Sequence, residues 1–100
     1  MEINIQFVKM PTSDHMTAFA RKKLERIAKR YDWILKADVY FKLEKDPKGK
    51  GKTCDIQLSL PGPRIFATSG DESFEAATDE TIRDLEKQLK KRKSEMKPHL

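Results

Sequence analysis

The sequence predicts an α+β fold, a two-layer sandwich in which a four-stranded mixed sheet carries both helices on one face. Short segments alternate apolar and polar residues, which is the period of a half-buried strand. Two longer segments repeat their apolar residues with the helical period. The chain has 100 residues, enough for one domain over residues 1–100 and too few for a second core. The element order is therefore predicted as β-α-β-β-β-α.

The first strand is expected over residues 2–8, where isoleucine and phenylalanine alternate with polar residues. Thr12 or Ser13 then provides an N-cap. A helix is predicted over residues 14–31 because its apolar residues fall on a single stripe. The stripe consists of Met16, Ala20, Leu24, Ile27, Ala28 and Tyr31.

Three further strands are predicted over residues 37–44, 53–60 and 64–68. Glycines and prolines at 46–51 and 61–63 mark the connections between them. Hairpin connections make these strands antiparallel, whereas the first helix is a crossover between two parallel strands. Each helix has one apolar stripe to bury, so both should cover the apolar face of the sheet.

A second helix is predicted over residues 71–96, with Ser69 and Glu72 as its capping box or with a start two residues later, and with Pro98 as its stop. At 1.5 Å per residue it is about 39 Å long, which exceeds a strand of this sheet. Its last turns should therefore project beyond the body of the domain. Its apolar stripe consists of Phe74, Thr78, Ile82, Leu85, Leu89 and Met96.

The net charge of +5 is not evenly spread along the chain. Residues 14–31 carry six bases and two acids. Residues 71–82 carry five acids and no base, and residues 83–97 carry seven bases and three acids. Acids at a helix start and bases at its end complement the macrodipole, so the charges alone are equally well explained as a solvated surface.

The helical period gathers these bases on one face of each helix. The faces hold Lys22, Arg26 and Lys29, flanked by Lys23 and Arg30, in the first helix, and Arg83, Lys87 and Lys90 in the second. With both helices on one side of the sheet, the faces would flank a shared groove about 10 Å wide. Such a groove suits a nucleic-acid backbone. Tyr40 and Phe66, on the polar face of the sheet, either stack on bases or simply cover exposed sheet.

No arrangement of residues predicts catalysis, a cofactor or a metal site. His15 and His99 have no second histidine at ligand spacing, and the single cysteine, Cys54, excludes an intrachain disulfide and a cysteine-rich zinc site. There is no apolar run of about 18 residues and no secretory or transit pattern at the N-terminus. We therefore expect a non-enzymatic cytoplasmic protein with no membrane partner.

Several short stretches, taken in order, are similar to one family. They are Lys23–Ile27 with Tyr31, Leu43–Lys45, and residues 76–79 and 85–91. On a β-α-β-β-β-α frame of this length, they resemble the short bacterial ribosome hibernation promoting factors and the related ribosome-associated translation inhibitors. The resemblance covers nearly the whole chain.

The resemblance implies a protein that occupies the mRNA/tRNA channel of the small ribosomal subunit and contacts rRNA through the basic faces of both helices. It would silence translation and preserve ribosomes in stress or stationary phase, as a monomer when off the ribosome. Long members carry an extra C-terminal domain that pairs ribosomes, so a short form implies a separate pairing protein or no pairing. Position by position, the family's basic contacts fall on Lys23, Arg26, Lys87, Lys91 and Lys93. The helical faces add Lys22, Lys29, Arg83 and Lys90.

Two positions depart from the family pattern. Asp84 stands where the family usually has lysine, and Arg83 points about 100° away from it around the helix. Thr78 stands at a usually aliphatic position, which should loosen packing slightly.

Three alternatives to ribosome binding are open. One is a general double-stranded RNA-binding module, whose α-β-β-β-α core overlaps this order. The others are a small enzyme of the acylphosphatase type, disfavoured because that fold ends on a strand, and a domain that binds an acidic protein.

Overall fold

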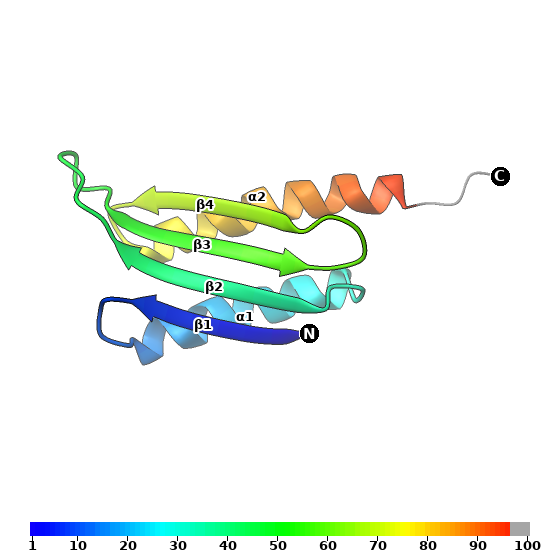
Figure 1. Ribbon diagram of the computed structural model, residues 1–100, viewed down its shortest axis with the longest axis horizontal. Helices are drawn as coiled ribbons and strands as arrows, with labels where there is room; N and C mark the ends of the chain where they lie inside the picture. The colour runs from blue at the N-terminus through cyan, green and yellow to red at the C-terminus, as the bar shows by residue number, and fades with distance from the viewer. Residues whose placement is uncertain (97–100) are drawn as a thin grey trace.

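Six elements follow one another in the predicted order. The computed structural model describes residues 1–96 (Figure 1). The elements are β1 (Glu2–Val8), α1 (Asp14–Arg30), β2 (Lys36–Leu43), β3 (Lys52–Ser59), β4 (Ile65–Asp71) and α2 (Phe74–Glu95). The two central strands start and end one residue earlier than predicted, and α1 ends one residue earlier.

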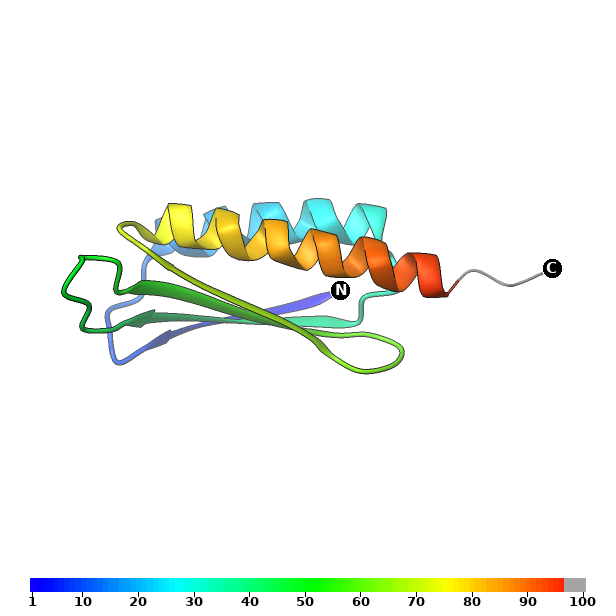
Figure 2. The same cartoon turned by 90° about the horizontal axis from the view of Figure 1, so that it is seen from above.

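The four strands form one mixed sheet in the order β1-β2-β3-β4. β1 pairs with β2 in parallel, and the other two pairs are antiparallel. This pairing follows from the connections, because α1 crosses over between β1 and β2 while β2, β3 and β4 are joined by hairpins. Both helices lie on the same side of the sheet (Figure 2). The predicted two-layer α+β sandwich is therefore confirmed.

The core lies between the sheet and the two helices. Ala37, Val39 and Phe41 alternate along β2 and are fully buried. The ring of Phe41 stacks on that of Phe7 with centroids 5.1 Å apart and meets Phe74 edge-on at 5.6 Å. From the predicted stripe of α1, all residues are buried except Ala28, which is half-buried. A period of two also places Leu43 on this face of β2, but Leu43 is 57% exposed, so its assignment to the core is wrong. The period-based assignment is confirmed for the other apolar positions of β2 and, apart from Ala28, for α1.

The start of α2 differs from the prediction. Ser69 lies within β4, which continues to Asp71, and the helix begins after Ser73. The Oγ of Ser73 accepts a hydrogen bond from the Ala76 N–H at 3.1 Å. The predicted Ser69 capping box is wrong because Ser69 is paired with Cys54 in the β3–β4 ladder. Strand pairing across the sheet thus overrides a locally valid capping pattern.

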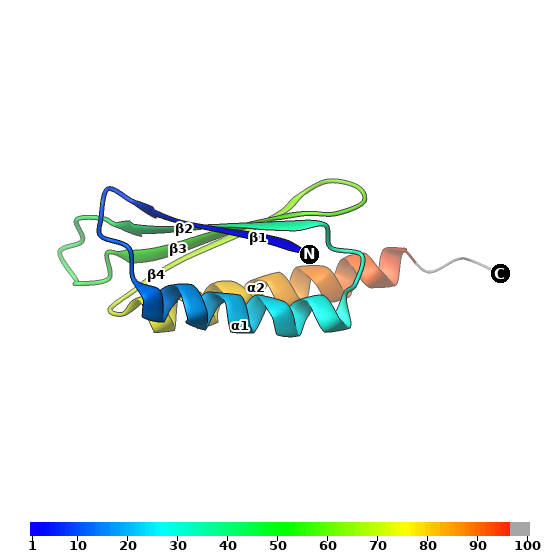
Figure 3. The same cartoon turned by 90° about the horizontal axis from the view of Figure 1, so that it is seen from below.

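The last turn of α2 extends past the ends of the strands (Figure 3). Met96, placed on the apolar stripe by the helical period, is 45% exposed, so that assignment is wrong. Pro98 lies outside the described residues.

Thr78 is fully buried, and its hydroxyl donates a 2.7 Å hydrogen bond to the carbonyl of Phe74. This bond satisfies the polar atom that replaces the usual aliphatic side chain.

Candidate nucleic-acid interface

The outer face of the helix layer carries six of the nine predicted basic residues. They are Lys22, Arg26 and Lys29 on α1 and Arg83, Lys87 and Lys90 on α2. All six are exposed, and none forms an ion pair with another residue of the range 1–96. Because the core fixes α1 and α2 side by side, these charges belong to one surface. We call these six residues the outer basic face.

Lys23 lies between the helices rather than on the outer basic face. Its Nζ is 2.8 Å from Oδ1 of Asp79 on α2, and its side chain is 27% exposed. The same ammonium lies 4.8 Å from the ring centroid of Phe19. Lys23 is therefore already paired within the protein.

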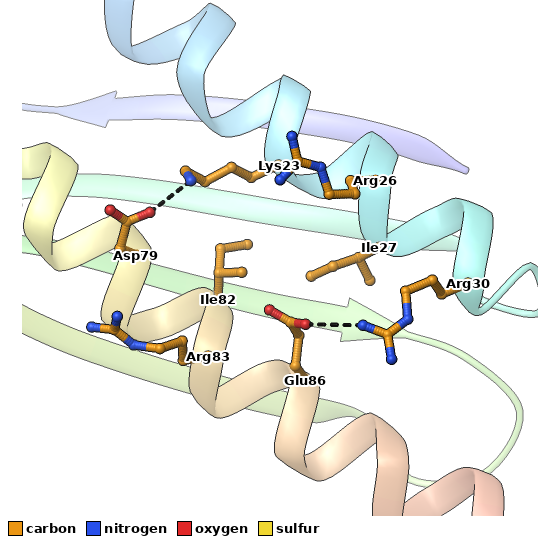
Figure 4. Close-up of a pocket in the computed structure, with 8 residues that line it drawn as sticks. All are labelled: Lys23, Arg26, Ile27, Arg30, Asp79, Ile82, Arg83 and Glu86. Carbon is orange, nitrogen blue, oxygen red and sulfur yellow. Dashed lines mark hydrogen bonds and ion pairs between the residues drawn. The ribbon is translucent and has the colours of Figure 1, made fainter.

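A cleft of about 160 Å³ separates the two helices (Figure 4). It is lined by Lys23, Arg26, Ile27, Arg30, Asp79, Ile82, Arg83 and Glu86. The predicted groove between the helices thus exists, but Asp79 and Glu86 place two carboxylates in it. Glu86 Oε2 is 3.3 Å from Nη1 of Arg30. Sequence reasoning missed the Lys23–Asp79 and Arg30–Glu86 pairs. A signal was present, because the two bases are seven residues apart on α1 and the two acids are seven residues apart on α2, a spacing of about two helical turns.

Lys91 and Lys93 lie on opposite flanks of α2. Nζ of Lys93 is 5.8 Å from the ring centroid of Tyr31, the residue that caps α1. Lys91 lines a hollow on the β4 side together with Ile65, Gln88, Arg92 and Glu95. Both lysines are exposed, but the structure does not bring them onto the outer basic face.

Arg92 is basic but serves the fold. Its guanidinium donates to the carbonyl of Pro61 at 3.1 Å and to that of Pro63 at 2.9 Å. The turn between them contains Gly62 at φ +91°, where an added Cβ would lie 3.1 Å from Nη1 of Arg92. Arg92 thereby ties the β3–β4 connection to α2.

Asp84 points away from the cleft. Its Oδ1 accepts a hydrogen bond from Nε2 of Gln88 at 3.2 Å, and the same Nε2 donates to the carbonyl of Phe66 in β4 at 2.9 Å. Arg83, one residue earlier, lines the cleft. At this level of α2 the base therefore faces α1 and the acid faces β4.

Two lysines on the uncovered face of the sheet are paired with carboxylates. Nζ of Lys42 is 3.0 Å from Asp55, and Nζ of Lys36 is 3.6 Å from Asp38. The hydrogen bond and negative charge of Asp55 raise the pKa of Lys42. Phe66 is 53% exposed on this face. These two lysines are therefore already neutralised within the protein.

Outside the interhelical cleft, the titratable residues within 1–96 show no arrangement suited to catalysis. Cys54 is fully buried, and burial raises the pKa of its thiol to about 11, which keeps it protonated and unreactive. Nε2 of the exposed His15 lies 3.2 Å from Glu75. Within residues 1–96, no three His, Cys, Asp or Glu side chains gather as metal ligands. His99 lies outside this range.

Neither α1 nor α2 has the length and apolar character needed to cross a bilayer.

Comparison with known proteins identifies the family. The chain is 28% identical over 93 residues to the ribosome hibernation promoting factor of Pseudomonas putida, covering 93% of this chain and 87% of that protein. The structure of a ribosomal subunit interface protein from Coxiella burnetii matches with a TM-score of 0.83 and 29% identity, covering 94% and 99% of the two chains. The N-terminal domain of Thermus thermophilus Protein Y matches with a TM-score of 0.77 and 29% identity, covering 91% and 98%.

These relatives confirm the resemblance to hibernation promoting factors, a family of ribosome-binding proteins without catalytic activity. Residues 3–97 match the family described as Sigma 54 modulation protein / S30EA ribosomal protein, which is nearly the whole chain. This chain therefore belongs to the Sigma 54 modulation protein / S30EA ribosomal protein family.

Proposed function

We propose that this protein binds the small ribosomal subunit in the channel for mRNA and tRNA, with its helix layer against rRNA. By filling the channel it silences translation and preserves ribosomes in stress or stationary phase. It acts in the cytoplasm as a monomer off the ribosome. The single observation that carries the proposal is the outer basic face, with three bases on each of two neighbouring helices that form no ion pair within residues 1–96.

The shape and rigidity of the domain support this role. The molecule measures 52 × 25 × 18 Å, which is long and narrow. The core fixes the two helices relative to each other, so the backbone needs no ordering when phosphates are contacted, and only the exposed side chains lose rotamer freedom. Each phosphate that a lysine or arginine neutralises releases condensed counterions. Lys91 and Lys93 add charge on the two flanks of α2 and widen the proposed contact.

Sedimentation with purified ribosomal subunits tests the proposed function. The protein should comigrate with small subunits in a sucrose gradient and should inhibit a cell-free translation reaction. An RNA duplex of equal charge serves as competitor, because a general double-stranded RNA-binding module would prefer the duplex. Recovery only at the top of the gradient, or displacement by the duplex at equal charge, would contradict the proposal.

Binding should depend steeply on salt. If about five bases contact phosphates, the logarithm of the association constant falls with the logarithm of salt concentration at a slope of about −3.5 to −4.5. The measurement is a titration of labelled protein with small subunits at several salt concentrations. A slope shallower than about −1 would mean that the outer basic face is ordinary solvated surface.

Arg83 and Asp84 should have unequal effects on binding. Arg83→Ala removes a base that lines the cleft, so small-subunit affinity should fall about threefold to tenfold at low salt and the salt slope should become shallower by somewhat under one unit. Asp84→Lys should change affinity less than about twofold, because Asp84 faces Gln88 and β4. Both variants are compared in one binding assay. A larger effect at Asp84 than at Arg83 would show that RNA contact on the β4 flank extends from Lys91 back to Asp84 and that Arg83 is not the main contact at this level of α2.

A further inference from the structure

Two carboxylates of α2 hold two cations of α1 across the interhelical cleft. Asp79 pairs with Lys23 at 2.8 Å, and Glu86 pairs with Arg30 at 3.3 Å (Figure 4). The two pairs are separated by about two helical turns on each helix, so they bridge the cleft at two points. In the free protein the inner cations of the proposed RNA-binding layer are therefore occupied by the protein's own anions.

The cleft nevertheless keeps an excess of positive charge. Its lining includes four cationic side chains and two carboxylates. Arg26 and Arg83 stand on opposite helices and form no ion pair within residues 1–96. Beneath them, Ile27 and Ile82 form an apolar floor (Figure 4). Four unneutralised cations here would repel each other, and the two carboxylates reduce that repulsion in the free protein.

A phosphate oxygen makes the same charge-assisted hydrogen bonds to lysine and arginine as a carboxylate oxygen does. The Asp79 and Glu86 side chains are 41% and 38% exposed, so both anions are in contact with solvent. Ion pairs of this exposure contribute little to stability, and exchanging one anion for another costs correspondingly little. The excess charge of the cleft favours the incoming anion.

We propose that the interhelical cleft is a phosphodiester site that Asp79 and Glu86 occupy in the free protein and that RNA phosphates take over on binding. This inference rests on the proposed function and adds Arg30 to its contact residues. The two carboxylates then act as internal competitors, which lower the affinity for RNA. A strand that places phosphates along the cleft gains Lys23 and Arg30, whereas a ligand that reaches only the outer basic face does not.

The first test is Asp79→Asn, measured as affinity for purified small subunits at one low salt concentration. Removing the competitor should tighten binding about threefold to fivefold. Glu25→Gln is the matched control, because it changes the net charge equally at an exposed position of α1 that has no ion pair within residues 1–96. The control should change affinity less than about twofold.

The second test repeats Asp79→Asn in a Lys23→Met background. If the carboxylate competes for Lys23, the gain falls to that of the Glu25→Gln control once the lysine is absent. Thermal unfolding of each variant checks that the fold is retained. Glu86→Gln with and without Arg30→Met repeats the measurement at the other end of the cleft, which keeps the test decisive if one variant fails to fold.

The outcomes separate the two proposals. Failure of the wild-type protein to bind small subunits contradicts the proposed function and this site with it. Three results with a wild type that binds would contradict the cleft site and leave the proposed function standing. Asp79→Asn could change affinity no more than Glu25→Gln does, it could raise affinity equally with and without Lys23, or it could lower affinity.

Discussion

Replacing Lys87 and Lys91 together by glutamate is expected to abolish binding to the small subunit without unfolding the protein. Lys87 lies on the outer basic face and Lys91 on the β4 flank of α2, and both are exposed. Each substitution exchanges an attraction to phosphate for a repulsion, so affinity at low salt should fall by on the order of 100-fold. Because neither side chain is packed, the free energy of unfolding should change by less than about 1 kcal/mol.

Cell-free translation is the measurement for this variant. The wild-type protein should inhibit the reaction, and the double variant should not. Lys45→Glu with Lys48→Glu makes the same change in charge at exposed positions of the β2–β3 loop, at the far end of the molecule from the last turns of α2 (Figure 1), and should retain inhibition. Full inhibition by the α2 variant, at an unchanged melting temperature, would remove Lys87 and Lys91 from the proposed interface.

Phe41→Ala is expected to lower the free energy of unfolding by about 3–5 kcal/mol. Phe41 is fully buried at the centre of β2 and contacts both Phe7 of β1 and Phe74 at the start of α2. Its loss leaves a cavity where the sheet meets the first turn of α2. Small domains have a total stability of about 5–15 kcal/mol, so this single change removes a large part of it.

Urea denaturation followed by circular dichroism measures the effect of Phe41→Ala. Phe66→Ala is the control, because Phe66 is exposed on the uncovered face of the sheet and its removal should cost less than about 1 kcal/mol. A loss below about 1 kcal/mol for Phe41→Ala would contradict the packing described above. Small-subunit affinity of Phe66→Ala also tests whether the uncovered face stacks on bases, since a stacking aromatic would weaken binding when removed.

The order, type and buried face of the elements were predictable from the sequence because each depends on local periodicity. A period of two places Val39 and Phe41 on one face of a strand, and a period of 3.6 places Leu24 and Ile27 on one face of a helix. Element boundaries were less predictable. Ser69 has the sequence pattern of a helix cap, but its pairing with Cys54 in β3 extends the strand, and that pairing depends on residues far along the chain.

The same distinction applies to the candidate interface. Helical phase is a local property, so the sequence by itself determined which bases share the outer basic face. Only the tertiary structure decided that Lys23 is paired with Asp79, that Arg92 holds the β3–β4 turn, and that Asp84 faces away from the cleft. The interhelical contacts join residues 56 positions apart, as Arg30 and Glu86 are. Their geometry is set by how both helices pack on the shared sheet, which no local pattern specifies.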